Sequence, residues 1–202
     1  MKRIIFPILI FLFLIPFCFS LSNNSEIIPK YENEISFVLQ NYPELENTTI
    51  FFTEKEISNT MEAKPKINFI FLKKQKREYK IVLNNETKSN SGILVSNLNS
   101  TQRIGIFSHE LGHIVDYENM SNFQIIFFGV QYIFPNSRRK IEHRVDEIAI
   151  NHGFGKELIE FTKLAFYGEN IPEKYKKKKF KYYYSPEELK ELQMKYGNSL
   201  IK

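Results

Sequence analysis

The pentapeptide His109-Glu110-Leu111-Gly112-His113 holds the residues of this chain best suited to metal chemistry. On a helix, residues four apart lie on one face, so both imidazoles can bind one tetrahedral zinc ion. Glu110 adjoins the first histidine and can reach a water bound to the same metal. Zinc lowers the pKa of its water towards neutrality, and a carboxylate in this place takes the proton as the water attacks a carbonyl. The pentapeptide therefore predicts a catalytic site with one zinc ion per chain.

A zinc ion held by two histidines needs a third protein ligand and a free position for water. Glu142 and Asp146 lie one turn apart on one face of a second expected helix. We expect Glu142 to bind the metal and Asp146 to accept a hydrogen bond from the free ring nitrogen of a ligand histidine. His143 is the alternative ligand. Adjacent helical residues point about 100° apart, so only one of the two faces the metal, and the pairing with Asp146 favours Glu142.

Residues 101–155 resemble the gluzincins, the zinc peptidases that pair HExxH with a downstream glutamate ligand. Residues 106–115 look like their active-site helix, and residues 142–149, followed by 151–155, are similar to their ligand helix. The resemblance implies a zincin-like core and the hydrolysis of peptide bonds by an endopeptidase. It also implies an edge strand near the metal that binds extended peptide by β-addition, and residues 92–97 are our candidate for that edge.

The residue that stabilises the oxyanion of the tetrahedral intermediate is open. Gluzincins usually bring a His, Tyr or Arg to this position. In this chain, spacing from the motif does not identify the residue that would take this role. Tyr117, Tyr132 and His152 are the candidates, and a purely structural role is the alternative for each.

The elements that position these residues follow from the hydrophobic pattern. Before Ser100 we expect a helix over residues 29–41, strands over 49–52, 66–72, 79–84 and 92–97, and a small helix opened by Thr53 and Glu56. After Ser100 the helical period predicts helices over 101–117, 139–152, 156–166 and 185–196. Gly112 lies inside the first of these helices. Glycine there lowers helix stability by up to about 1 kcal/mol relative to alanine, so its presence suggests a close packing contact.

Strands followed by helices indicate an α+β fold. We expect a small twisted, mostly antiparallel sheet, followed by the active-site helix, the ligand helix and C-terminal helices. No repeat or low-complexity linker interrupts the chain, so residues 21–202 are expected to form a single domain.

The N-terminal residues 1–20 have the layout of a secretory signal peptide, with Lys2 and Arg3 before an apolar run. We expect cleavage after Ser20 and an extracytoplasmic protein, secreted or periplasmic. The alternatives are an uncleaved anchor and a lipoprotein lipidated at Cys18. Because Cys18 is the only cysteine, the mature domain would have no disulfide bond and would depend on its packed core.

The net charge of +5 is modest and gives no reason to expect nucleic-acid binding. Lysines cluster at residues 174–181, interleaved with aromatic residues, and we expect a solvated connector there. Residues 120–139 form an apolar insert that is too short for a confident membrane span. We expect it to be buried over the active site. A membrane-contacting lip at 123–134, acting with the lysine cluster, is the alternative.

Two other classes of protein fit parts of this pattern. One is a binding protein that keeps zinc for structure, although such a closed site needs no base beside its first ligand. The other is a membrane-surface module in which the motif is accidental. The sequence favours a zinc peptidase acting on a peptide or protein substrate, and it assigns neither the cleavage specificity nor the oligomeric state.

Overall fold

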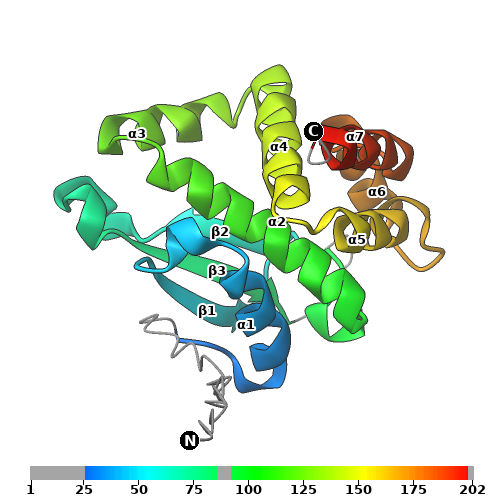
Figure 1. Cartoon of the computed structure of the whole chain (residues 1–202), viewed down its shortest axis with the longest axis horizontal. Helices are drawn as coiled ribbons and strands as arrows, with labels where there is room; N and C mark the ends of the chain where they lie inside the picture. The colour runs from blue at the N-terminus through cyan, green and yellow to red at the C-terminus, as the bar shows by residue number, and fades with distance from the viewer. Residues whose placement is uncertain (1–25, 86–91, 200–202) are drawn as a thin grey trace, which may run out of the picture.

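The computed structural model describes residues 26–85 and 92–199 (Figure 1). The predicted signal peptide and Cys18 lie outside these ranges. The described elements are η1 (Pro29–Tyr31), α1 (Glu32–Gln40), η2 (Pro43–Leu45), β1 (Thr49–Lys55), β2 (Met61–Pro65), η3 (Ile67–Phe71), η4 (Lys74–Lys76), β3 (Glu78–Asn84), η5 (Val95–Asn97), α2 (Ser100–Glu118), α3 (Asn122–Gln131), α4 (Pro135–Asn151), α5 (Gly155–Tyr167), α6 (Glu173–Tyr182) and α7 (Pro186–Ser199), where η marks a 3-10 helix. The fold class is α+β, as predicted.

The sheet has the strand order β1-β3-β2. β1 pairs with β3 in parallel, and β2 pairs with β3 antiparallel, so the sheet is mixed and the predicted mostly antiparallel sheet is wrong. β3 is the strand richest in buried residues, among them Tyr79, Ile81 and Leu83. It takes the central position for that reason and separates two strands that are neighbours in sequence. β2 is left at an edge.

Three predicted elements of the sheet region are wrong. Residues 66–72 form η3 rather than a strand, because Ile67, Ile70 and Phe71 are exposed and burial does not alternate. The expected helix opened by Thr53 and Glu56 is absent, since β1 continues in register with β3 as far as Lys55.

The predicted edge strand at residues 92–97 is also wrong, and the edge strand in contact with α2 is β2. Residues 95–97 form η5, and residues 92–97 pair with none of the strands that the structure describes. A Cβ added at Gly92 would lie 2.3 Å from the backbone carbon of Asn59. The segment therefore packs across the chain that enters β2, and Ile93 N donates to Thr60 Oγ1 at 3.1 Å.

The predicted long helices are confirmed as α1, α2, α4, α5 and α7. A capping box begins α2: Asn99 Oδ1 accepts from Gln102 N, and Gln102 Oε1 accepts from Asn99 N. Ser185 and Glu188 form the same reciprocal pair at the start of α7. Two helices were not predicted as such: α3 lies in the apolar insert and α6 in the lysine cluster.

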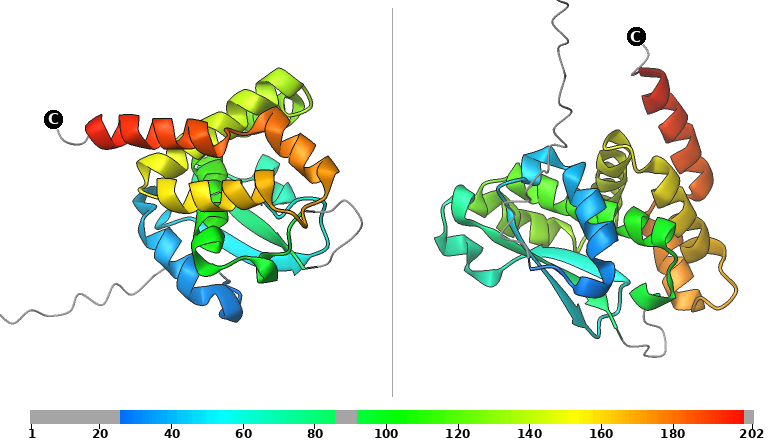
Figure 2. Two further views of the ribbon diagram at one scale, coloured as in Figure 1. Left: turned by 90° about the vertical axis from the view of Figure 1, so that its right-hand side faces the viewer. Right: turned by 60° about the horizontal axis from the view of Figure 1, so that its bottom comes forward.

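Helix α2 lies between the sheet and the C-terminal helices (Figure 1). It packs against α1 and β2 on one side and against α4 and α5 on the other. In the right-hand view of Figure 2 the sheet lies to the left, while α5, α6 and α7 lie to the right. Every residue of α2 from Gly105 to Tyr117 is buried, so the motif is held in the centre of the molecule. Among the described residues, no helix has the length and apolar character needed to cross a membrane.

Candidate metal centre

Helices α2 and α4 bring together His109, His113 and Glu142. Their potential ligand atoms all lie within 4.8 Å of one another, and all three side chains are buried. The two histidine rings are one turn apart, with centroids 5.0 Å apart and planes at 85°. The cluster thus joins the motif on α2 to the glutamate that the sequence singled out on α4.

The distances within this cluster suit a tetrahedral metal ion. Glu142 Oε2 lies 3.3 Å from His109 Nε2 and 3.5 Å from His113 Nε2. Ligands about 2.0–2.1 Å from a tetrahedral zinc ion are about 3.3–3.4 Å apart. Glu142 Oε2 is buried and has no hydrogen-bond partner in the described part of the chain. A buried carboxylate oxygen of this kind is costly unless a cation or donor satisfies it, so the residues present fit a metal ion.

Asp146 lies behind the cluster on the same face of α4 as Glu142. Its Oδ1 is 2.7 Å from His109 Nδ1, the ring nitrogen that does not face Glu142. Burial alone would lower the pKa of His109, but the hydrogen bond to Asp146 and the nearby carboxylate of Glu142 raise it to about 10. Burial would likewise raise the pKa of Glu142, but the two histidines hold it well below its usual range. A divalent cation bound by these residues would place a positive charge beside the buried carboxylate of Glu142.

Glu110 lies beside the cluster and faces β2. Its Oε2 accepts a hydrogen bond from Ala63 N at 2.6 Å. Burial raises the pKa of Glu110, against the opposing effect of His109 and His113. A carboxylate with a raised pKa is a better proton acceptor than an ordinary surface glutamate.

A pocket of about 310 Å³ opens next to these residues. One wall comes from α2 and another from β2, while α3 and the chain after α6 complete it. It is lined by Asn59, Met61, Glu62, Ala63, Lys64, Glu110, His113, Tyr117, Phe128, Gly129, Tyr132 and Tyr183. The apolar insert contributes Phe128, Gly129 and Tyr132 to the pocket wall. Its expected burial over the site is confirmed only in part, because most of its other apolar residues are exposed.

Two contacts fix the distance between α2 and α4. A Cβ added at Gly112 would lie 3.1 Å from both Val145 O and Val145 Cγ1, so the glycine permits the close approach that its position suggested. Arg144 also donates from Nε and Nη2 to the carboxylate of Asp116, at 2.5–3.0 Å. Helix α4 is thus held against α2 at the level of the cluster.

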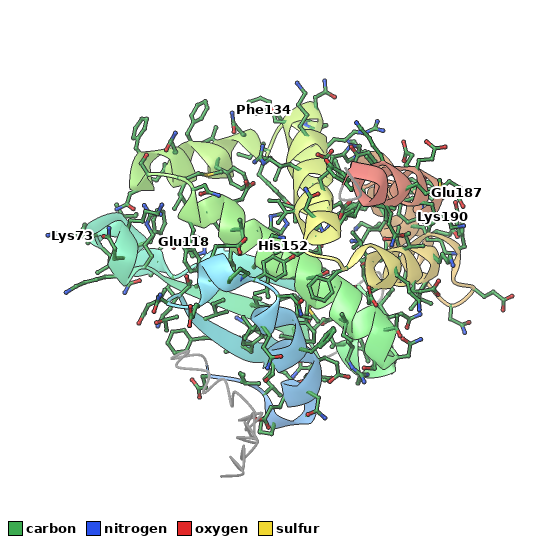
Figure 3. The ribbon with its side chains drawn as sticks, in the orientation of Figure 1. Lys73, Glu118, Phe134, His152, Glu187 and Lys190 are labelled. Atoms are coloured by element: carbon green, nitrogen blue, oxygen red, sulfur yellow. The ribbon has the colours of Figure 1, made fainter. Side chains whose placement is uncertain are left out.

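Of the three oxyanion candidates, two line the pocket and one lies elsewhere, and the alternative ligand His143 is outside the cluster. Tyr117 and Tyr132 line the pocket, and the Tyr132 hydroxyl donates to Glu142 Oε1. His152 lies elsewhere, near the end of α4, where it stacks on Tyr42 at 4.0 Å and contacts Glu44 Oε1 (Figure 3). His143 stacks on Tyr184 at 3.6 Å and is not part of the cluster.

Two residues near the cluster were missed by the sequence reasoning. Arg138 Nε lies 3.6 Å from Glu142 Oε1, and its guanidinium group contacts the rings of Tyr132 and Tyr182. Its position four residues before Glu142, on the same helix face, was the available signal. Tyr183 lines the pocket, with its ring 5.7 Å from that of His109. No spacing signal marks it, because it follows α6 and reaches the site only through the tertiary fold.

Comparisons of the chain with protein-family models, with curated proteins and with solved structures found no match.

Proposed function

We propose that this protein is a zinc-dependent endopeptidase of the zincin type, with His109, His113 and Glu142 as metal ligands. The observation that carries the proposal is the buried cluster of three ligand atoms within 4.8 Å, with an unsatisfied Glu142 oxygen facing both histidines. The resemblance of residues 101–155 to the gluzincins, which rests on the same three residues, also supports it. Export is part of the proposal and rests on the N-terminal sequence alone.

Bound zinc would act as a Lewis acid and lower the pKa of a water at the open position. Glu110 is the general base in this proposal, because it adjoins the cluster, lines the pocket and has a raised pKa. The hydrogen bond from Ala63 N keeps one oxygen of Glu110 in place, which leaves the other free to take a proton.

The edge strand β2 is the proposed binding site for an extended peptide. Thr60 O and Lys66 N bond to β3, so even-numbered residues of this stretch use their backbone groups within the sheet. The backbone groups of the odd-numbered residues Met61 and Ala63 therefore point away from β3, towards the open edge. The hydrogen bond from Ala63 N to Glu110 is an example. Met61 and Ala63 also line the pocket. A peptide added along this edge would pass beside Glu110 and His113.

Two hydroxyl groups in the pocket wall remain for the oxyanion. Tyr132 is engaged with Glu142, so its proposed role is to orient that ligand. Tyr117 and Tyr183 line the same pocket as Glu110 and His113. Burial raises the pKa of both, which keeps each phenol protonated and able to donate.

A peptide-library digest tests the proposed activity. The full chain supplied with zinc is expected to cleave internal peptide bonds, and removal of zinc by a chelator is expected to stop cleavage until zinc is restored. Mass spectrometry of the products distinguishes internal cleavage from trimming at the ends. A zinc-loaded chain that leaves the whole library intact would contradict the proposal.

Asp146→Asn is expected to weaken zinc binding by about 10-fold to 100-fold. A neutral amide orients the ring of His109 less well than a carboxylate does, and it does not raise the basicity of the imidazole. The measurement is a competition titration against a chromogenic chelator. Glu147→Gln is the matched control on the next residue, since that carboxylate accepts from Tyr184 and Tyr196 rather than from a histidine. Equal zinc affinity for the two variants would argue against the role given to Asp146.

A further inference from the structure

Helix α3 has an apolar face that no other part of the described chain covers, as well as the face that it buries. Ile125 and Phe128 point inward, with 5% of each exposed. The outward residues recur at helical spacing and continue past the helix end: they are Phe123, Ile126, Phe127, Val130, Ile133 and Phe134. None of these outward residues lines the pocket beside the cluster. Substrate binding in the pocket therefore does not account for them.

A second apolar segment, η3, lies against the start of α3. Ile67 and Phe71 protrude from it, with 86% and 89% of their surface exposed. Asn122 ties the two segments together, because its Nδ2 donates to Leu72 O at 2.8 Å and its Oδ1 accepts from Arg77 Nε at 2.9 Å. The exposed apolar residues of η3, α3 and the turn after α3 thus form one surface, which we call the α3–η3 surface.

The α3–η3 surface has a neutral part on α3 and a row of lysines next to η3. Residues 119–137 contain no charged side chain, so the α3 part is wholly neutral. The exposed lysines Lys73, Lys74 and Lys76 follow η3 directly. An open groove of about 590 Å³ lies between the two segments, and its lining includes Lys73, Lys74, Arg77 and Phe123. In Figure 3, Lys73 and Phe134 both lie at the outer edge of the molecule.

We propose that the α3–η3 surface binds the headgroup region of an anionic lipid bilayer, with its apolar side chains inserted and the lysines of 73–76 on the lipid phosphates. Aromatic and aliphatic side chains protrude from two separate segments of this surface. A protein partner would need a matching cavity for each of them, whereas a bilayer accepts protruding apolar groups without one. Apolar residues beside a row of lysines complement the acyl chains and anionic headgroups of such a bilayer. This surface goes beyond the peptidase proposal and does not depend on it.

The basic residues in this proposal differ from those expected from the sequence. The cluster at 174–181 lies on α6, which packs against α4 and α5. Lys179 of that cluster is buried, with its Nζ 3.7 Å from the centre of the Tyr183 ring. The lysines next to the exposed apolar residues are instead those that follow η3.

The absence of tryptophan from the chain permits a site-specific test. Phe127→Trp and Phe180→Trp each introduce a single reporter, at residues that are 56% and 53% exposed, on α3 and α6 respectively. Each full-length variant is mixed with vesicles of phosphatidylcholine, with or without about one quarter phosphatidylglycerol, and with brominated acyl chains to detect insertion. Because the readout is local, it does not depend on how the N-terminal residues behave.

Anionic vesicles are expected to shift the emission of the Phe127→Trp reporter to the blue and to allow quenching by brominated chains. The Phe180→Trp reporter is expected to show neither effect. Adding Lys73→Glu, Lys74→Glu and Lys76→Glu to the Phe127→Trp chain should weaken vesicle binding by about tenfold or more. The same three changes at Lys174, Lys177 and Lys181 are the charge-matched control and should leave binding within about twofold.

Several outcomes would overturn the proposal. One is a folded Phe127→Trp chain that anionic vesicles leave unchanged or that neutral vesicles affect equally. Another is quenching at Phe180→Trp instead, or loss of binding only in the α6 lysine variant. Blue-shifted emission of the Phe127→Trp reporter without lipid would show that a protein segment covers the surface: a second copy if the shift grows with protein concentration, and the same chain if it does not.

Discussion

Replacing Glu110 by glutamine is expected to lower the rate of peptide hydrolysis by about a hundredfold to ten-thousandfold while zinc stays bound. The amide oxygen of glutamine can still accept from Ala63 N, so the local structure should survive. What the variant loses is the ability to take a proton from the attacking water. The loss should therefore fall on kcat rather than on KM. Steady-state kinetics on a peptide found in the library digest, together with zinc analysis of the same sample, measure both effects.

Glu118→Gln is the matched control for this change. Glu118 lies on the same helix, but its carboxylate accepts from the Tyr79 hydroxyl, at 2.5 Å, and does not line the pocket. This variant should keep both zinc and activity. A Glu110→Gln chain as active as the wild type would remove Glu110 from the mechanism. A folded Glu110→Gln chain that lost its zinc would contradict the proposed ligand set, in which Glu110 has no part.

The largest expected effect on stability comes from Gly105→Ala. A Cβ at this position would lie 2.3 Å from Glu157 O and 2.5 Å from Glu157 C, in the first turn of α5. These are backbone atoms, so relief requires α5 to move away from α2. We expect the free energy of unfolding to fall by about 2–3 kcal/mol and the melting temperature to fall by about 5–10 °C. This loss would exceed the gain of up to about 1 kcal/mol that alanine usually brings to a helix.

Gly129→Ala provides the comparison, because nothing lies within 4 Å of a Cβ added in that part of α3. Its melting temperature should stay the same or rise slightly. Thermal melts of the two variants and the wild type, followed by circular dichroism, test the packing of α2 against α5. Equal melting temperatures for the Gly105 and Gly129 variants would contradict that packing.

The helices were predictable because their signals are local. The apolar face of residues 101–117 and the proline after Ser185 needed no tertiary information, and both elements formed close to the expected bounds. Gly112 was interpreted correctly as a packing contact, because close approach to a neighbouring helix offsets the cost of a glycine inside a long helix. The joint position of His109, His113 and Glu142 followed from two helix faces, each of which could be derived from spacing.

The sheet was less predictable because its order depends on long-range pairing. Residues 66–72 have strong strand propensity, yet the strand formed five residues earlier, at Met61–Pro65. Apolar residues at 67, 70 and 71 are exposed, and a propensity argument assumes that such residues are buried. Tyr183 was missed for a related reason, since its contact with the cluster depends on how the chain after α6 folds back over α4. Arg138 was missed although its spacing four residues before Glu142 on α4 was a local signal.

The central claim is that His109, His113 and Glu142 hold a zinc ion, and metal analysis of purified full-length protein tests it most directly. We predict about one zinc per chain for the wild type and for His143→Ala, and loss of that zinc in Glu142→Ala and His113→Ala. A folded wild type that takes up no zinc at micromolar concentrations would contradict the claim. So would a Glu142→Ala chain that binds zinc as tightly as the wild type.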